Sequence, residues 1–202
     1  YRLLWAAAET TRRAAGNQGM VGAQIGLNAE PCSGGCSFCA YSGRSGGYSG
    51  SWRMDKESLV TETAAFVAAG ANYLSLMTTA DYPFELFLEM SAAARSVMPR
   101  DMLLSANIGA FGRDEASALR RAGYGRVYHV VRLGEGRETA LSVEARIRTI
   151  ECAAAENLEI AFCVEPVAPV HSDEELAEMI ELSLRFSPTT AAVMRLIPKA
   201  SG

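Results

Sequence analysis

The feature that most constrains the fold is a repeated alternation of strand-like and helix-like segments. Short aliphatic runs such as 73–77 and 158–164 predict strands, and longer segments with apolar residues at helical spacing separate them. The predicted strands are 20–28, 73–77, 102–106, 126–133, 158–164 and 191–197, and the predicted helices are 1–15, 55–69, 83–98, 114–122, 143–156 and 173–186. Alternation with short connections implies parallel strands joined by right-handed crossovers. We therefore expect an α/β fold of six strand–helix units, too few for a closed eight-stranded barrel.

Length and composition fit a single domain. The chain has 202 residues, of which 49% are hydrophobic, a value typical of globular proteins rather than disordered ones. We expect an N-terminal helical segment over residues 1–20 and a core domain over 21–202. Tyr1 is not an initiator methionine, and Ser201-Gly202 follow a strand-like run directly, so we expect both ends to be cut and the core domain to be truncated at its C-terminus.

Charge and hydropathy exclude several classes of partner. The formal net charge is −4, so no global attraction to nucleic acid or to an anionic membrane is expected. No apolar run approaches the length of a membrane span, and the N-terminus lacks a signal-peptide pattern. Five cysteines, three of them clustered, do not form the pattern of a disulfide framework. These features predict a reduced, cytoplasmic protein.

A cluster of cysteines follows the first predicted strand. Cys32, Cys36 and Cys39 form the pattern Cys-x3-Cys-x2-Cys. Thiolates are soft ligands that prefer zinc, copper(I) or iron–sulfur clusters, and closed zinc or cluster sites use four protein ligands. Three thiolates on a short loop could hold three corners of a [4Fe–4S] cluster and leave one iron open to another ligand. The loop lies at the carboxyl end of a strand, where parallel α/β folds place their active sites.

Two other hypotheses about the function of the three cysteines stay open at this point. One is a structural zinc loop with a fourth ligand from Cys152, Cys163, His129 or His171, although the strand–loop–helix context suits an open cluster better. The other is an electron-transfer cluster protein, but such clusters normally take four cysteines. Both alternatives describe a metal-binding module without enzymatic activity.

The cysteine pattern, with Phe38 directly before the last cysteine, resembles the signature of the radical S-adenosylmethionine enzymes. In that family the open iron chelates the amino and carboxylate groups of S-adenosylmethionine, and reduction yields methionine and a 5′-deoxyadenosyl radical that abstracts hydrogen from substrate. The resemblance implies an open (β/α)6 partial TIM barrel. It also implies a [4Fe–4S] cluster and S-adenosylmethionine as cofactors, a small-molecule substrate, and an electron donor such as flavodoxin or ferredoxin.

Later stretches resemble one branch of this family, which holds biotin synthase, the [FeFe]-hydrogenase maturase, methylornithine synthase and the thiazole-forming tyrosine lyase. Residues 104–109 and 121–124 are similar to the third unit of these enzymes. Residues 143–150 resemble the helix whose arginine pairs with the carboxylate of S-adenosylmethionine, and the matching position is Arg146. Arginine suits this role because its planar guanidinium binds carboxylates bidentately and stays charged.

The chain departs from biotin synthase at the positions of a second cluster. Biotin synthase holds a [2Fe–2S] cluster with cysteines on three barrel strands, and the corresponding positions here are Ser75, Ser105 and the neighbourhood of Ala161. Cys163 lies two residues beyond Ala161, but a lone cysteine cannot hold that cluster. We therefore expect a rearrangement, a C–C cleavage or a maturase-like reaction rather than sulfur insertion.

The resemblance also implies cofactor contacts in three loops. Thr78 and Thr79 follow the second predicted strand, where the family contacts the methionine amino group; the alternative is an ordinary connecting loop. Tyr41 resembles an aromatic residue that packs near adenine, or it packs under the loop. Asn107 is placed to hydrogen-bond cofactor or substrate across the barrel, or to cap the following loop.

Charged residues near the ends of the last three strands complete the candidates. Arg132, Glu135 and Glu138 compete for one polar contact to the ribose or carboxylate of the cofactor, and the glycines around Glu135 leave the choice open. Glu165 directly follows the predicted strand 158–164, and Arg195 lies within the last predicted strand, which is expected to be buried otherwise. A charge at such a position is costly unless it is paired. They are candidate substrate-binding residues, and the alternative is a structural Arg–Glu pair.

Overall fold

The computed structural model of the chain describes residues 1–16, 18–44 and 47–197, and it confirms the predicted alternation. The helices are α1 (Arg2–Ala14), α2 (Lys56–Ala68), α3 (Phe84–Arg95), α4 (Arg113–Arg121), α5 (Val143–Ala155) and α6 (Asp173–Leu184). The strands are β1 (Gly22–Gly26), β2 (Asn28–Ala29), β3 (Trp52–Arg53), β4 (Tyr73–Met77), β5 (Leu103–Asn107), β6 (Arg126–Tyr128), β7 (Glu159–Val167) and β8 (Thr190–Arg195).

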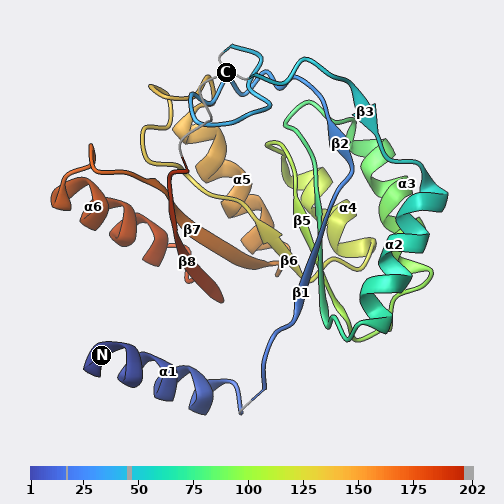
Figure 1. Ribbon diagram of the computed structural model, residues 1–202, viewed down its shortest axis with the longest axis horizontal. Helices are drawn as coiled ribbons and strands as arrows, with labels where there is room; N and C mark the ends of the chain where they lie inside the picture. The colour runs from blue at the N-terminus through green and yellow to red at the C-terminus, as the bar shows by residue number, and fades with distance from the viewer. Residues whose placement is uncertain (17, 45–46, 198–202) are drawn as a thin grey trace.

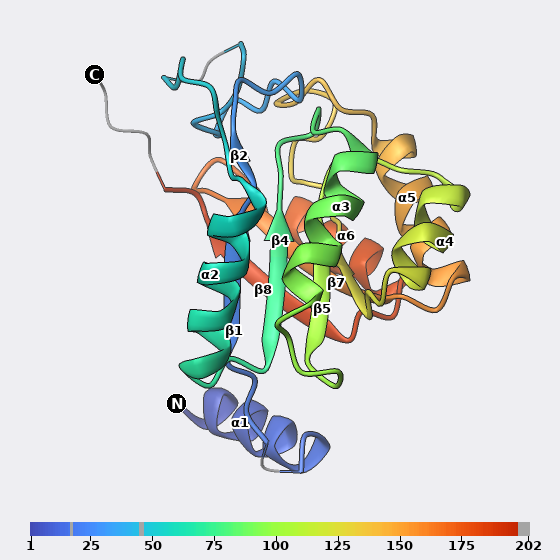
Figure 2. The same cartoon turned by 90° about the vertical axis from the view of Figure 1, so that its right-hand side faces the viewer.

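Six of the strands form one sheet in the order β1-β4-β5-β6-β7-β8, with every neighbouring pair parallel. The sheet curls into a half-barrel with helices α2 to α6 on its outer side (Figures 1 and 2). This arrangement is the expected partial (β/α)6 barrel. Because all strands run in the same direction, their carboxyl ends and the loops that follow them meet at one end of the barrel.

The core lies between the sheet and the helices, and strand alternation explains it. Leu74 and Leu76 of β4 are fully buried on the side that faces the helices, as is Leu104 of β5. Ser75 and Ser105 point to the opposite, inner face and are paired in register across β4 and β5. These inner positions are the ones at which a second cluster would need cysteines, and both hold serine.

Side-chain caps define where several helices begin. The Asp55 carboxylate accepts a hydrogen bond from the amide of Ser58 at the start of α2, and Ser142 Oγ accepts one from Ala145 at the start of α5. The cap at Ser142 fixes the first turn of α5, which carries Arg146.

Three features of the fold differ from the sequence predictions. Strand β6 ends at Tyr128, five residues before the predicted end at Leu133. Strand β8 is exposed rather than buried, with Val193 at 69% and Met194 at 49% exposure, and it forms an edge of the described sheet, where it pairs with β7. The antiparallel pair β2–β3, which joins the two ends of the cysteine loop, was not predicted.

Helix α1 lies at the opposite end of the barrel from the cysteine loop (Figure 1). None of its residues, all of which are described, is buried. Among the helices that the structure describes, none has the length and apolar character needed to cross a membrane.

Candidate functional site

A cavity of about 400 Å³ opens at the carboxyl ends of the strands. Its walls come from β1, the cysteine loop, the loops after β4, β5 and β6, and helix α5. The described residues that line it are Gln24, Gly26, Asn28, Cys32, Gly34, Cys36, Cys39, Tyr41, Met77, Thr78, Thr79, Ala80, Asn107, Ile108, Gly109, Arg132, Leu141 and Arg146. The structure therefore brings together the three cysteines and six of the eight residues considered for cofactor contact, all except Glu135 and Glu138.

The three cysteines are partly exposed and all face this cavity. Cys32 Sγ accepts hydrogen bonds from the backbone amides of Gly34 and Ala80, each with an N···S distance of 3.4 Å. Amide donors stabilise a thiolate and are typical of sulfur atoms that bind metals. Burial raises the pKa of the Cys36 thiol, and the nearby positive charge of Arg132 opposes that shift.

The cysteine loop is closed by backbone hydrogen bonds at its two ends. The Cys32 amide donates to the Tyr41 carbonyl at 2.7 Å, and the Gly43 amide donates to the Cys32 carbonyl at 3.0 Å. Gly35, near the middle, has a φ of +59°, which favours glycine. The loop therefore presents its three sulfur atoms on one short, tightly turned segment.

Three thiolates on one loop could hold three corners of a [4Fe–4S] cluster, or three positions around a single metal ion. Within the described residues, no group of three or more His, Cys, Asp or Glu side chains is arranged to hold one metal ion. His129, one of the proposed fourth zinc ligands, is instead hydrogen-bonded to Arg146.

Arg146 lies on the first turn of α5 and lines the cavity. Its side chain is buried, with Nη1 3.2 Å from His129 Nε2 and Nε 3.5 Å from Glu135 Oε2. The Nε atom is buried and has no hydrogen-bond partner. Burial and the charge of Arg132 lower the pKa of Arg146. A carboxylate bound in the cavity beside Arg146 and Arg132 would offset the repulsion between the two arginines.

Only one of the three competing residues after β6 faces the cavity. Among the described lining residues, Arg132 is present, and Glu135 and Glu138 are not. Glu135 is buried behind Arg146, where its Oε2 accepts from the Arg132 amide at 3.0 Å and its Oε1 accepts from Thr139 Oγ1 at 2.5 Å. Glu138 turns to the cysteine loop, where its carboxylate accepts a hydrogen bond from Ser37 Oγ at 2.6 Å.

Glu165 pairs with Arg132 rather than with Arg195. Arg132 Nε lies 3.2 Å from Glu165 Oε1, and the Tyr128 hydroxyl donates to Glu165 Oε2 at 2.8 Å. Arg195 is exposed on the edge strand and is not among the described residues that line the cavity. Cys163, on the same strand as Glu165, is fully buried, and burial raises its pKa to about 11.

Asn28 is a cavity residue that sequence reasoning missed. It is buried, its Oδ1 accepts from the Thr79 amide at 2.9 Å, and its Nδ2 donates to Thr79 Oγ1 at 2.8 Å. Asn28 therefore ties the entry of the cysteine loop to the loop after β4. A polar residue at the carboxyl end of the first predicted strand is the one signal that could have indicated it.

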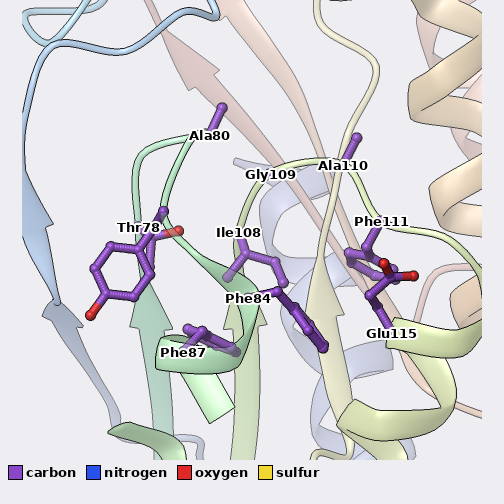
Figure 3. Close-up of a pocket in the computed structure, with 10 residues that line it drawn as sticks. Thr78, Ala80, Phe84, Phe87, Ile108, Gly109, Ala110, Phe111 and Glu115 are labelled. Carbon is purple, nitrogen blue, oxygen red and sulfur yellow. The ribbon is translucent and has the colours of Figure 1, made fainter. Parts of the chain in front are cut away.

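A second, smaller cavity of about 70 Å³ lies behind the first, between the loops after β4 and β5 and helices α3 and α4 (Figure 3). Thr78, Ala80, Ile108 and Gly109 line both cavities, and Thr78 Oγ1 is buried without a hydrogen-bond partner. A Cβ atom on Gly109 would lie 2.3 Å from the Ala80 carbonyl oxygen. Glycine is therefore required where these two loops touch.

His129 predicts a pH dependence of stability. Burial and the charge of Arg146 lower its pKa well below the usual value, and because arginine only donates, His129 Nε2 accepts and the proton lies on Nδ1. The unfolded chain takes up a proton below about pH 6.5 while the folded chain does not, so stability is lost as the pH falls below that value. We expect the free energy of unfolding, measured with urea, to fall between pH 6.5 and 5.5 with a slope approaching about 1.4 kcal/mol per pH unit. In the variant His129→Gln this part of the pH dependence should be absent. If the free energy of unfolding fell equally with pH in both proteins, His129 would not be its cause.

Comparisons with known proteins agree with the fold. Scans against protein-family models and curated proteins gave no match. Among solved structures, methylornithine synthase (PylB) superposes with a TM-score of 0.84 at 19% identity, over 98% of this chain and 60% of that one. HydG from Carboxydothermus hydrogenoformans, an [FeFe]-hydrogenase maturase, superposes with a TM-score of 0.76 at 20% identity. The match covers 97% of this chain and 49% of HydG.

A more distant match is TsrM from Kitasatospora setae, a radical S-adenosylmethionine methyltransferase solved with cobalamin and a [4Fe–4S] cluster. Its TM-score is 0.56 at 16% identity, over 89% of this chain and 34% of that one. The chain thus spans 60% or less of the length of these three structures. Its fold is the one that the sequence resemblance implied, that of methylornithine synthase and the [FeFe]-hydrogenase maturase.

Proposed function

We propose that this chain, which has the fold of methylornithine synthase and HydG, is the core of a radical S-adenosylmethionine enzyme that acts on a small molecule. The observation that carries the proposal is the cavity itself. Three cysteines on one loop and the buried Arg146 of α5 line one space at the carboxyl ends of the strands. TsrM, which shares the fold at lower similarity, has a [4Fe–4S] cluster in its structure.

In this proposal Cys32, Cys36 and Cys39 hold a [4Fe–4S] cluster, and Arg146 binds the carboxylate of S-adenosylmethionine. When bound, the reduced cluster supplies the electron that cleaves S-adenosylmethionine to methionine and a 5′-deoxyadenosyl radical. Thr78, Thr79, Asn107 and Tyr41 provide polar and aromatic contacts around the cofactor.

The rest of the barrel positions the reactants and keeps water away from them. Arg132, held by Glu165, contributes the second positive charge of the cavity wall. The substrate would lie at the mouth of the barrel, and flavodoxin or ferredoxin would provide the electron. Since Ser75 and Ser105 replace cysteines of a second cluster, we propose a rearrangement, cleavage or maturase-like reaction rather than sulfur insertion.

Anaerobic reconstitution with iron and sulfide tests this function directly. The reduced protein should convert S-adenosylmethionine to 5′-deoxyadenosine and methionine, measured by liquid chromatography after addition of dithionite. The matched control is the same protein without dithionite, which should yield no 5′-deoxyadenosine. Stoichiometric zinc without iron, or a cluster inert towards S-adenosylmethionine, would favour a non-enzymatic metal-binding module instead.

A further inference from the structure

Two serines in the cysteine loop are each bound by a carboxylate from a different neighbouring loop. Ser33 directly follows Cys32, and its amide and hydroxyl donate to the two oxygens of Asp81 at 2.7 and 2.5 Å. Ser37 directly follows Cys36, and its hydroxyl donates to Glu138. The amide of Ser37 also donates to the Glu138 carbonyl at 2.8 Å. The cysteine loop is therefore held from both sides, by the loop after β4 and by the loop after β6.

Asp81 belongs to a run of three residues that all bind the cysteine segment. Thr79 is hydrogen-bonded to Asn28, the Ala80 amide donates to Cys32 Sγ, and Asp81 binds Ser33. Figure 3 shows Ala80 at the tip of this loop, beside the loop that carries Gly109. The contact with Gly109 fixes the other side of Ala80. The amide that points at the Cys32 sulfur thus has its position set by neighbours on both sides.

We propose that Asp81 is a positioning residue that shapes the cysteine loop before any cluster is bound. It holds Ser33 so that Cys32 Sγ lies between the amides of Gly34 and Ala80, and the loop does not have to reorganise when the cluster assembles. The link to cluster assembly rests on the proposed function, whereas the ordering of the loop is a property of the protein without metal. Glu138 provides the corresponding support for Ser37.

The two supports differ in a way that makes Asp81 testable. Ser33 and Asp81 are both exposed, so the Ser33 amide depends on the Asp81 side chain for its protection from exchange with solvent. The Ser37 amide instead donates to the backbone carbonyl of Glu138, which a side-chain substitution leaves in place. Substitution at position 81 should therefore expose one amide, and substitution at position 138 should not expose the other.

The experiment is hydrogen exchange by NMR on the ¹⁵N-labelled protein without metal. In Asp81→Ala the Ser33 amide should exchange about tenfold faster or more, since a hydrogen bond to a charged acceptor is lost. Asp81→Asn, which keeps one carbonyl acceptor, should lie between Asp81→Ala and the parent protein. In Glu138→Ala the Ser37 amide should keep its rate. Asp101→Ala, which removes a carboxylate from the turn before β5 at the other end of the sheet, should change neither amide.

Cluster assembly is followed on the same proteins by iron content against time. Asp81→Ala should take up iron more slowly than Asp101→Ala. Equal exchange of the Ser33 amide in Asp81→Ala and the parent protein would overturn the proposal, and so would equal assembly rates. If none of the proteins takes up iron, the proposed function fails, and the exchange rates still decide whether Asp81 orders the loop.

Discussion

Replacement of Cys36 by alanine is expected to abolish the bound iron–sulfur cluster and all cleavage of S-adenosylmethionine. The loop has three cysteines to bind a [4Fe–4S] cluster, and Cys36 lines the cavity together with the other two. Loss of one ligand leaves two open irons, which is not a stable arrangement for a cluster that must also bind a cofactor. Iron and acid-labile sulfide per chain, measured after anaerobic reconstitution, check the prediction.

The other two cysteines of the chain provide matched controls for this result. Cys163 is fully buried on β7, and Cys152 lies on α5, and neither lines the cavity among the residues that the structure describes. The variants Cys152→Ala and Cys163→Ala should therefore keep the full iron content. If either variant lost its metal as Cys36→Ala does, a fourth protein ligand would be involved, and this result would favour the closed metal site.

The alternation of elements and the location of the site were predictable because both depend on local sequence. A strand such as 73–77 is defined by its own residues, and parallel strands necessarily place their following loops at one end. The cysteine spacing and the position of Arg146 are likewise short-range patterns. Once six units are arranged side by side, these separate stretches must face a common space. The cavity confirms this placement, and the roles of its residues stay predictions.

The contacts between loops could not be predicted, because they depend on distances set by the whole sheet. Asn28 and Thr79 lie 51 positions apart, and Ser33 and Asp81 lie 48 apart, so no periodicity links them. Which of Glu135 and Glu138 lies next to Arg146 could not be predicted for a related reason. Gly134 and Gly136 both have positive φ, at 77° and 81°, and the turns that they make decide which carboxylate lies behind Arg146.

The exposure of β8 shows a different limit of sequence reasoning. An apolar run predicts a strand, but whether the strand is buried depends on which elements cover it. Only β7 pairs with β8 in the described sheet, and Arg195 therefore lies at its exposed edge. The sequence allowed an ion pair between Arg195 and Glu165, but in the structure Glu165 pairs with Arg132. Side-chain pairing within a barrel is thus less predictable than strand order.

Substitution of Arg146 by methionine should weaken the binding of S-adenosylmethionine roughly tenfold to a hundredfold. Hydrogen bonds to charged groups contribute about 1.5–3 kcal/mol, and each 1.4 kcal/mol corresponds to a tenfold change in affinity. The described hydrogen bonds and ion pairs of Arg146 go to His129 and Glu135 rather than to the cysteines, so the iron content should be unchanged. Calorimetric titration of the reconstituted protein with S-adenosylmethionine provides the measurement.

The single substitution has a second effect that must be separated from the first. The Glu135 side chain is only 1% exposed, and loss of Arg146 leaves this buried carboxylate without its ion-pair partner, at a cost of about 3–5 kcal/mol in stability. The double variant Arg146→Met/Glu135→Gln removes that unpaired charge. It should recover stability in urea unfolding, because the glutamine oxygen at position 135 can accept from the Arg132 amide while the glutamine amide group donates to the Thr139 hydroxyl, which itself can donate to the Leu141 carbonyl. It should not recover binding, because the guanidinium is still missing. If the double variant bound S-adenosylmethionine as tightly as the parent protein, Arg146 would serve only to neutralise Glu135. The carboxylate of the cofactor would then require a different partner. Among the described residues that line the cavity, Arg132 is the other arginine.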